Sequence, residues 1–507
     1  MPIVTQDQIA SEEFSPNQEH WLYCGLDNCV TKEVEDKLKE QASNQIEESY
    51  KRTYRMQLPA LAMSLRGMRV DMQEQARCSL EFSAEADRME AYINSMAVAI
   101  WKQGLNPRSP HQLKKLFYEY MDLPKQYKVE KGKRTVSTNR DALEALTKYK
   151  WAKPMARAIL SLRDTAGLIK VVKSGIDPDG RMRMGYNVAG TETYRWSSNK
   201  NIAGGGTNGQ NITEKMRRMF ISDEGYKFGY ADLEQAESRV VGYLADDTAY
   251  IDACESGDLH TTVCKLVWPD LGWTGDPVED RRIADQSFYR HFSYRDMGKR
   301  GGHATNYYGK AITVARHLQV PVNLIDKFQA AYLEAFPGIP RWWTATQQQL
   351  QDKGWIETPF GRVRQFFGRR HDDATLREAI AFNPQSTVGD YLNEGLWVAY
   401  EELDAAGGPL METPFQILGQ VHDAIVFQFL EERRGLIDDL RQCMDIPVKM
   451  PSGSTMRIPS DVAVGYNWAH TDPKKRFFED GNPAGLTDFG PDESQVRTFG
   501  SILDATL

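Results

Sequence analysis

The spacing of apolar residues predicts helices in the first part of the chain. Between residues 76 and 103 apolar side chains such as Leu80 and Ala84 recur every three or four positions, which is the period of an amphipathic helix. Residues 27–50 have the same spacing with many charges and predict one solvated helix. The stretch HQLKKLFYEYM predicts a shorter helix that Ser109 can cap. The run KVEKGKRTVST has no helical period and predicts a mobile basic loop or hairpin.

The pattern changes after the glycine cluster NIAGGGTNG at residues 201–209, which predicts a flexible connection. YKFGYADL (226–233) is short and aromatic and predicts a strand that runs directly into the helical segment EQAESRVVGYLA. Residues 280–352 are predicted to be mainly helical. PFQILGQVHDAIVFQFL (414–430) contains two apolar runs around a polar His-Asp pair and predicts a hairpin. Residues 471–507 lack a period and predict a loosely packed or disordered tail.

Length and composition limit the protein class. The 507 residues have room for about three domains. No apolar stretch approaches the ~18 residues of a membrane span, and the first residues lack the basic flank and apolar core of a leader. We therefore expect a cytoplasmic protein without membrane contact. The six cysteines are scattered without metal-binding spacing, which predicts reduced, structural thiols.

Charge is distributed unevenly along the chain. The total of −8 argues against a polyanion partner. Residues 111–175, however, carry +9 and residues 281–316 carry +6, whereas residues 1–60 carry −5. Such runs are often only solvated helix faces. Attraction to phosphate nevertheless depends on local charge, because it is screened beyond about 8–10 Å, and the segregation therefore indicates two candidate polyanion surfaces.

Two aspartates stand at the ends of predicted strands, with a cationic helix between them. Asp232 ends a strand and Asp423 lies at the hairpin turn. Each alone is most often a cap or turn residue. The helix places four side chains of complementary chemistry on one face, namely Arg295, Lys299, His303 and Tyr307, each four residues apart. An Arg and a Lys one turn apart can clamp successive phosphates, and the rings offer a platform for a base.

Together these features predict a reaction at a triphosphate. Two carboxylates can hold two divalent cations about 3.5–4 Å apart for an in-line displacement, and oxygen ligands favour magnesium. The chain contains no G-x-x-x-x-G-K-[ST] loop, so a P-loop nucleotidase is excluded.

Ordered motifs then give a family resemblance. YADLEQAESRVVGYLA resembles motif A of the family A DNA polymerases, the DNA polymerase I group; RDMGKRGGHATNYYG resembles motif B, and QVHDAIVF motif C. Further blocks follow in the same order: TETYRWSS with GQNI, MRRMFISDEGY, GDLHTTV, TPFGRVR and AFNPQSTVGD. Upstream, LRGMRVD, LNPRSPHQLKKLF and VSTNRDALEAL are similar to thumb-side segments. The similarity covers about residues 50–470.

The resemblance implies an α+β fold, a right hand with an antiparallel palm sheet, helical fingers and a helical thumb. The implied parts are a remnant or docking segment (1–54) that resembles the end of a 3′–5′ exonuclease domain, a thumb (55–200), a palm (201–245 and 355–470), fingers (246–354) and an acidic tail (471–507). The implied activity is template-directed DNA synthesis in DNA replication. A primer 3′-hydroxyl is extended with deoxynucleoside triphosphates, using two Mg²⁺ ions for which Mn²⁺ can substitute.

The family's functional residues map onto this sequence. The resemblance makes Asp232, Asp423 and Lys299 catalytic, and it makes the two aspartates and the main-chain carbonyl of Leu233 metal ligands. Expected nucleotide contacts are Arg295, Lys299, His260, Glu237, Gln235, His303 and Tyr307, with Glu237 as a steric gate against the ribose 2′-hydroxyl. Expected primer-template contacts are Arg195, Gln210, Asn211, Gln385 and His422.

The sequence departs from the family pattern at three places. His303 occupies a position that is usually Phe or Tyr, and Tyr308 is inserted between Tyr307 and the glycine that normally follows the tyrosine. We take Tyr307 as the match because it keeps the helical register from Lys299. Ala424 follows Asp423 where Glu is common. A third acidic group is therefore missing, and the two aspartates have to suffice as the metal-binding carboxylates.

The N-terminal segment predicts the absence of proofreading. Tyr23 to Asp27 is similar to the last motif of the 3′–5′ exonuclease domain, but only 22 residues precede it, too few for the other carboxylates. Either the chain is cut, or a separate exonuclease or processivity subunit binds through residues 1–50; a helical leader with a chance match is the alternative. Compact motifs favour a phage-type enzyme acting in the host cytoplasm. Two other functions stay open: a single-subunit RNA polymerase, and a non-catalytic DNA-binding subunit of a replication complex.

Overall fold

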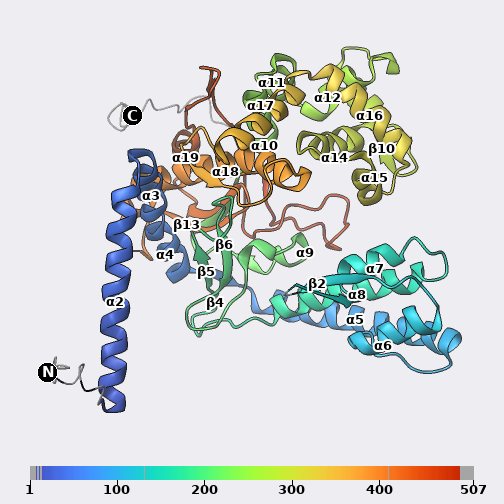
Figure 1. The fold of residues 1–507 in the computed structure, drawn as a ribbon, viewed down its shortest axis with the longest axis horizontal. Helices are drawn as coiled ribbons and strands as arrows, with labels where there is room; N and C mark the ends of the chain where they lie inside the picture. The colour runs from blue at the N-terminus through green and yellow to red at the C-terminus, as the bar shows by residue number, and fades with distance from the viewer. Residues whose placement is uncertain (1–6, 8–10, 12–13, 131, 409, 491–507) are drawn as a thin grey trace.

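A five-stranded antiparallel sheet lies at the centre of the protein (Figure 1). The computed structural model describes residues 7, 11, 14–130, 132–408 and 410–490. The strand order is β13-β14-β8-β17-β18, and the bounds are β8 (Tyr226–Leu233), β13 (Phe415–Val421), β14 (Ala424–Leu430), β17 (Ser460–Gly465) and β18 (Thr487–Asp488). The predicted strand at 226–233 and the predicted hairpin at 414–430 are both confirmed.

Helices cover one face of this sheet and form the largest core. The strands contribute buried Ala231, Leu233 and Phe427, which pack with Leu392 and Leu396 of the long helix α18 (Asp373–Ala399). The same core includes α10 (Ala236–Ala245) and α19 (Leu436–Met444). Apolar burial of this kind is worth roughly 25 cal/mol per Å², so the strand ends that carry the candidate residues rest on the largest core of the molecule.

A helical lobe with a core of its own follows α10 along the chain. It contains α11 (Thr248–Glu255), α12 (Leu259–Val267), α13 (Pro277–Ala284), α14 (Tyr294–Asn306), α15 (Ala311–Leu318), α16 (Val322–Ala335) and α17 (Gly338–Lys353). Phe328, Tyr332 and Phe336 are buried at its centre. A short hairpin, β9 (Ser287–Tyr289) and β10 (Phe292–Ser293), interrupts the helices. The sequence predicted the helices but not this hairpin.

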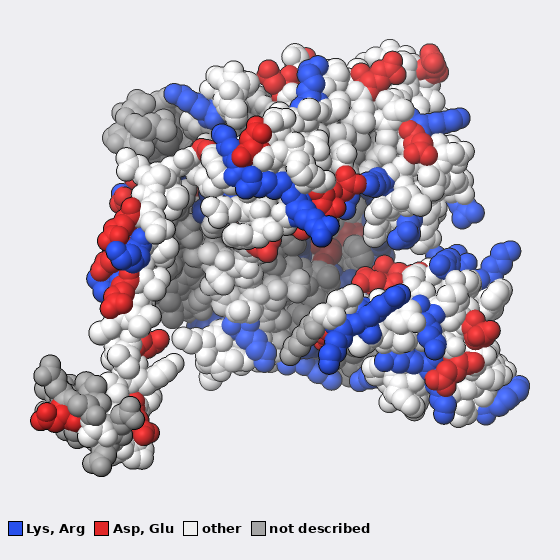
Figure 2. Space-filling view, in the orientation of Figure 1, with Lys and Arg blue, Asp and Glu red and all other residues white. Residues whose placement is uncertain are grey.

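A second lobe projects from the sheet below α14 in the view of Figure 1. It is built from α5 (Met72–Trp101), α6 (Pro110–Lys114) with a π-helical turn (Lys115–Tyr120), α7 (Arg140–Leu146) and α8 (Lys153–Val172). Its basic run forms a hairpin of β2 (Tyr127–Glu130) and β3 (Lys133–Val136). Ser109 caps α6 as predicted, because its hydroxyl accepts from the Gln112 amide. The face in Figure 2 is hollowed between this lobe and the α14 lobe.

Shorter elements connect these parts. They are β1 (Met68–Val70), β4 (Arg181–Met182), β5 (Met184–Asn187), β6 (Ser197–Lys200), α9 (Glu214–Arg217), β7 (Phe220–Ile221), β11 (Trp355–Glu357), β12 (Val363–Gln365), β15 (Val448–Lys449), β16 (Thr455–Met456) and short 3₁₀ or π turns at Gly209–Asn211, Pro269–Leu271, Tyr400–Asp404 and Ala405–Gly407. None of the helices in the described part of the chain is long and apolar enough to cross a membrane.

The N-terminal segment differs from the single helix predicted at residues 27–50. It forms α2 (Pro16–Gln41) and α3 (Asn44–Arg55), followed by α4 (Gln57–Arg66). Ser43 is the reason for the break, because its hydroxyl accepts from the Ile46 amide and caps α3. Ser15 and Gln18 form a capping box that starts α2 earlier than predicted.

Two further predictions need correction. Residues 471–490 are not loosely packed: Phe478, Asn482 and Leu486 are buried, and β18 pairs with β17; residues 491–507 lie outside the described residues. All six cysteines are free, but Cys24 and Cys29 are exposed. A structural role therefore fits the four buried cysteines.

Candidate active site

The two predicted aspartates meet at one end of the sheet. Asp232 lies near the end of the central strand β8, and its register partner on β14 is Ala424, the residue after Asp423. Asp423 and His422 form the two-residue turn between β13 and β14, and His422 has the left-handed φ of 58° that such a turn needs. The Leu233 amide donates to the Asp423 carbonyl at 3.1 Å. The ladder therefore joins two residues that are far apart in sequence.

Both carboxyl groups resist ionisation in the protein alone. Burial, Asp423 and Asp461 raise the pKa of Asp232 to about 7, and burial raises the pKa of Asp423. Asp461 is the register partner of Asp232 on β17. It supplies a negative charge on one side of Asp232, whereas Ala424 on the other side has none. The sequence did not indicate Asp461, because only strand pairing brings it next to Asp232.

The donor set fits a hard divalent cation held by few protein ligands. Carboxylate oxygens are the ligands that Mg²⁺ prefers, and a cation would stabilise the ionised form of both aspartates. Among the residues that the structure describes, no group of three or more His, Cys, Asp or Glu side chains has metal-binding geometry. Asp232 and Asp423 therefore fit Mg²⁺ only as part of a larger ligand set.

A cationic and aromatic layer supports the end of β8. The Arg217 guanidinium lies over the rings of Tyr230 and Trp468, at 5.6 and 4.8 Å from their centroids. His470 packs edge-on against Tyr230, and its amide donates to Glu214 at 2.6 Å. Arg217 and His470 both lower the pKa of Asp232 in part. These residues were missed from the sequence, where they carry no spacing that marks them.

Glu237, near the start of α10, joins three segments of the chain. The Tyr307 hydroxyl donates to Glu237 at 2.5 Å, and Arg195 forms an ion pair with the same carboxylate. Burial disfavours the ionised form, but Arg195 and Tyr307 outweigh it and lower the pKa of Glu237. Arg195 also donates to the Gln385 carbonyl at 3.3 Å. The structure thus brings together four of the predicted nucleotide and primer-template residues.

The predicted cationic stripe lies on α14. Arg295 donates to Asp258 at 3.1 Å, and Lys299 is exposed. His303 is exposed and packs edge-on against Tyr307, which follows the last residue of the helix. The Nε2 atom of His303 is 3.9 Å from the Glu237 carboxylate. Arg295, Lys299 and His303 therefore lie on α14 at four-residue spacing, and Tyr307, directly after the helix, contacts Glu237 of α10.

His260 on α12 lies beside this stripe. Burial, Arg295 and Lys299 lower the pKa of His260 to about 4, so the imidazole is neutral at pH 7. Asp258 stays ionised: burial opposes this, but hydrogen bonds from Thr261 and Arg295 bring the pKa of Asp258 to about 2. Positive charge thus outweighs negative charge around His260, which suits a polyanionic ligand.

The inserted tyrosine has a separate place. Tyr308 has a φ of 57° and packs edge-on against Trp343, with 5.1 Å between ring centroids. It points to the lobe core rather than to Glu237. Tyr307 is therefore the tyrosine that reaches the site, as the helical register predicted.

Hydrogen bonds between glutamine side chains connect two more of the predicted residues, Gln210 and His422. Gln210 donates to the Trp196 carbonyl at 3.0 Å and lies 3.4 Å from Gln420, which in turn donates to the His422 carbonyl at 3.0 Å. Asn211 follows Gln210 in the same turn and is exposed. Gln235 has a left-handed φ of 53°, and its side-chain oxygen is buried without a hydrogen-bond partner among the described residues.

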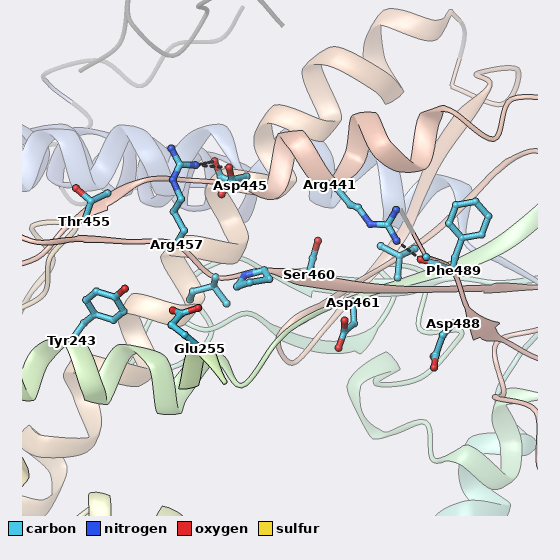
Figure 3. A pocket seen from close by; sticks show the side chains of 14 residues that line it. Tyr243, Glu255, Arg441, Asp445, Thr455, Arg457, Ser460, Asp461, Asp488 and Phe489 are labelled. Atoms are coloured by element: carbon cyan, nitrogen blue, oxygen red, sulfur yellow. Dashed lines mark hydrogen bonds and ion pairs between the residues drawn. The ribbon is translucent and has the colours of Figure 1, made fainter. Parts of the chain in front are cut away.

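A pocket of about 770 Å³ lies along β17, beside the aspartate pair (Figure 3). Its charged lining is partly neutralised within the protein, because Arg457 pairs with Asp445 and Arg441 pairs with Asp438. Asp461 and Asp488 point to the same side of the strands in Figure 3. Of the residues that bear on Asp232, Asp461 alone lines this pocket, so the pocket is a neighbour of the aspartate site rather than the site itself.

Comparisons with known proteins fit this geometry. Residues 72–470 match the sequence model described as DNA polymerase family A. The chain is 27% identical over 430 residues to the thermostable DNA polymerase I of Thermus aquaticus (80% of this chain, 46% of that protein). It is 28% identical over 448 residues to DNA polymerase I of Rhizobium leguminosarum (83% and 40%). The chain spans about half the length, or less, of these relatives.

A solved structure shows the same architecture. The POL domain of Pol1 from M. smegmatis, in complex with DNA primer-template and dNTP, superposes with a TM-score of 0.64 at 23% identity, covering 82% of this chain and 69% of that one. This likeness confirms the predicted fold class: an α+β right hand with an antiparallel sheet.

Proposed function

The chain belongs to DNA polymerase family A, and on that basis we propose that it is a template-directed DNA polymerase that extends a primer 3′-hydroxyl with deoxynucleoside triphosphates in DNA replication. The observation that carries the proposal is the register of β8, β14 and β17, which sets Asp232 and Asp423 together at one sheet end. In the reaction, a bond forms between the 3′-oxygen and the α-phosphorus, the bond from that phosphorus to pyrophosphate breaks, and the hydroxyl loses its proton.

Asp232 and Asp423 are the proposed metal-binding residues, with the Leu233 carbonyl as a further ligand. Two Mg²⁺ ions, or Mn²⁺ in their place, would supply activation of the attacking hydroxyl and neutralisation of the leaving group. The carboxylates must be ionised for this role. Arg217 and His470 help by lowering the pKa of Asp232 against the effect of burial.

Three residues on α12 and α14 are the proposed triphosphate site. Arg295 is held by Asp258, so its guanidinium is oriented before the ligand binds. Lys299 has no ion pair with any described residue, so its ammonium group can donate three hydrogen bonds to phosphate oxygens. It can also transfer one proton to the pyrophosphate leaving group. Neutral His260 can donate one hydrogen bond without adding charge.

The Glu237 cluster is the proposed sugar and primer-end site. The short hydrogen bond from Tyr307 fixes the Glu237 carboxylate, which supports its proposed role as a steric gate. Gln235 and His303 complete the nucleotide site. Arg195, Gln210, Asn211, Gln385 and His422 are proposed to contact the primer-template, testing base-pair shape through minor-groove acceptors.

The hollow between the two lobes is the proposed DNA path (Figure 2). The predicted thumb (55–200) contributes the basic segment 111–175, and the predicted fingers (246–354) contribute 281–316. The palm (201–245 and 355–470) lies between them. Local positive charge on both sides of a hollow attracts phosphates despite the net charge of −8. A separate exonuclease or processivity subunit and a cytoplasmic location stay predictions.

Primer extension with an Asp423→Asn variant tests the proposal. We expect extension to fall at least ~1,000-fold while primer-template affinity stays within about twofold, because the change removes a metal ligand but little volume. Asp488→Asn, an exposed carboxylate on β18 of the same sheet, is the matched control and should extend normally. If wild type and Asp423→Asn both bind DNA but neither extends a primer, the chain is a binding subunit.

A further inference from the structure

The N-terminal helices expose an unusual amount of apolar surface. Of the 28 exposed large apolar side chains in the described part of the chain, 12 lie between residues 21 and 65. Eleven of them form two sets, which we call the α2 stripe (Tyr23, Leu26, Val30, Val34 and Leu38) and the α3–α4 stripe (Ile46, Tyr50, Tyr54, Leu58, Leu61 and Leu65). Trp21 lies on the opposite side of α2, since it is nine residues, or two and a half turns, from Val30. Scattered exposed apolar residues need no explanation, but contiguous ones indicate an interaction site.

The α3–α4 stripe is held outward by polar contacts to the body. Ser49 donates to the Gly361 carbonyl, Thr53 accepts from Arg362, and Arg55 pairs with Glu394. Helix α3 buries none of its residues, so it docks by its polar side and presents Ile46, Tyr50 and Tyr54 to solvent. This reverses the usual arrangement, in which a surface helix buries its apolar face. The contacts fix the stripe in place as a preformed surface.

The stripe continues from α3 into α4. Met56 joins the helices with helical angles (φ −64°, ψ −12°), so Tyr54, Leu58, Leu61 and Leu65 keep a three-to-four spacing across the junction. Twenty residues at 1.5 Å per residue give a stripe of about 30 Å. Helix α2 extends away from the body beside α3 (Figure 1) and has no buried residue.

The two stripes are large enough for a stable complex. Eleven side chains, each about half exposed, offer on the order of 800 Å² at roughly 150 Å² per large apolar side chain. One partner of a typical stable protein interface contributes about 800 Å². Together the two stripes therefore expose about as much apolar surface as one side of such an interface buries.

Charge and spacing favour a different protein over a second copy. Residues 16–41 contain six acidic and three basic residues, and all three lysines are already paired within the helix, with Glu35, Asp36 and Glu40. Two copies of α2 would therefore bring like charges together. Leu26, Val30, Val34 and Leu38 recur every four residues, which drifts around the helix and does not give the 3.5-residue seam of a coiled coil.

We propose that the α2 and α3–α4 stripes form a docking surface for a second folded protein, whose contact face is an apolar groove rimmed by Lys and Arg. The surface lies outside the family-matched residues 72–470, on a segment that contributes none of the proposed catalytic residues. Docking there attaches the partner without occupying the hollow proposed for DNA. The surface is independent of the proposed polymerase activity, and each can fail without the other.

Site-specific crosslinking followed by reconstitution tests this surface. The full chain, with p-benzoylphenylalanine at Val30 or Tyr50, is irradiated in the cells that naturally contain it, and Tyr92 on α5 serves as the control position. The crosslinked protein is then purified, and its Kd is measured against wild type, Leu26→Glu/Val30→Glu/Val34→Glu, and the control Leu80→Glu/Tyr92→Glu.

The expected result is one basic protein crosslinked at Val30 and Tyr50 but not at Tyr92. Its Kd should rise at least ~30-fold in the α2 variant, stay within about twofold in the control, and rise with salt. Primer extension and circular dichroism of the α2 variant should match wild type, since α2 buries nothing. Three results would overturn the proposal. The crosslinked product is a dimer of this chain, its yield does not exceed that of the Tyr92 control, or the Kd of the partner is unchanged by the α2 substitutions.

Discussion

The end of the sheet and the face of α14 carry opposite charges and are built differently. Asp232 and Asp423 are half-buried at the end of strands that rest on the largest core, and their burial raises both pKa values. Arg295 and Lys299 lie on one helix of a lobe with its own core, and Lys299 is exposed. The sheet thus holds two carboxyl groups that form no ion pair with any described residue, and their ionisation is disfavoured until a cation binds, whereas α14 offers positive charge in a lobe with its own core. In the proposed reaction the first region orients the reacting atoms and the second one binds the triphosphate.

The largest expected effect concerns the sheet. Asp232→Asn should lower the maximal rate of nucleotide addition at least ~1,000-fold with little change in nucleotide affinity, because it removes a metal ligand and leaves α14 intact. Single-turnover primer extension over a range of dNTP concentrations measures both quantities. A loss confined to nucleotide affinity would contradict the division between the two regions.

Lys299→Ala should act on the other region. We expect the apparent Kd for dNTP to rise about 10–100-fold, since hydrogen bonds to charged groups contribute roughly 1.5–3 kcal/mol, with a smaller fall in rate. Arg300→Ala is the matched control: it removes a neighbouring cation that lies over the Phe292 ring, off the stripe. Equal effects of both substitutions would show that only the general charge of α14 matters.

Glu237→Ala sharpens the comparison where the two regions meet. The ratio of ribonucleotide to deoxynucleotide insertion should rise at least about tenfold, because the 2′-hydroxyl gains space and the Tyr307 bond is lost. Glu237→Gln, which keeps the volume, should raise the ratio less. An unchanged ratio in the alanine variant removes the reason to prefer DNA over RNA synthesis.

The smallest effect is on stability. The pKa of Asp232 in the folded protein, about 7, exceeds the ordinary value of 3.8, so the folded state binds the proton more tightly. Without divalent cations, stability should therefore fall as pH rises from about 4 to 7. Asp232→Asn should reduce this slope, because only the smaller contribution of Asp423 remains, and should stabilise the protein at pH 8 by about 1–3 kcal/mol. Thermal melts of wild type and variant in EDTA at pH 5 and 8 measure this pH dependence of stability. An equal or steeper dependence in the variant would show that the raised pKa of Asp232 is not its cause.

The sequence predicted those parts of the site that local pattern determines. Asp232 and Asp423 could be found because each follows an apolar run, and the α14 stripe because its spacing is helical. Asp461, Arg217 and His470 could not, since only the register of β17 and the packing on Tyr230 bring them near Asp232. Among the elements, the β9–β10 hairpin, the break at Ser43 and the packing of residues 471–490 depend on capping and tertiary contacts rather than on periodicity.

Single-turnover extension by Asp232→Asn and Lys299→Ala, compared side by side with wild type, separates the two regions most directly. The structure predicts that the sheet variant loses rate at unchanged dNTP affinity, and that the α14 variant loses dNTP affinity with most of its rate retained at saturation. Full rate in Asp232→Asn at saturating dNTP and Mg²⁺ would show that the chemistry does not take place at the end of β8.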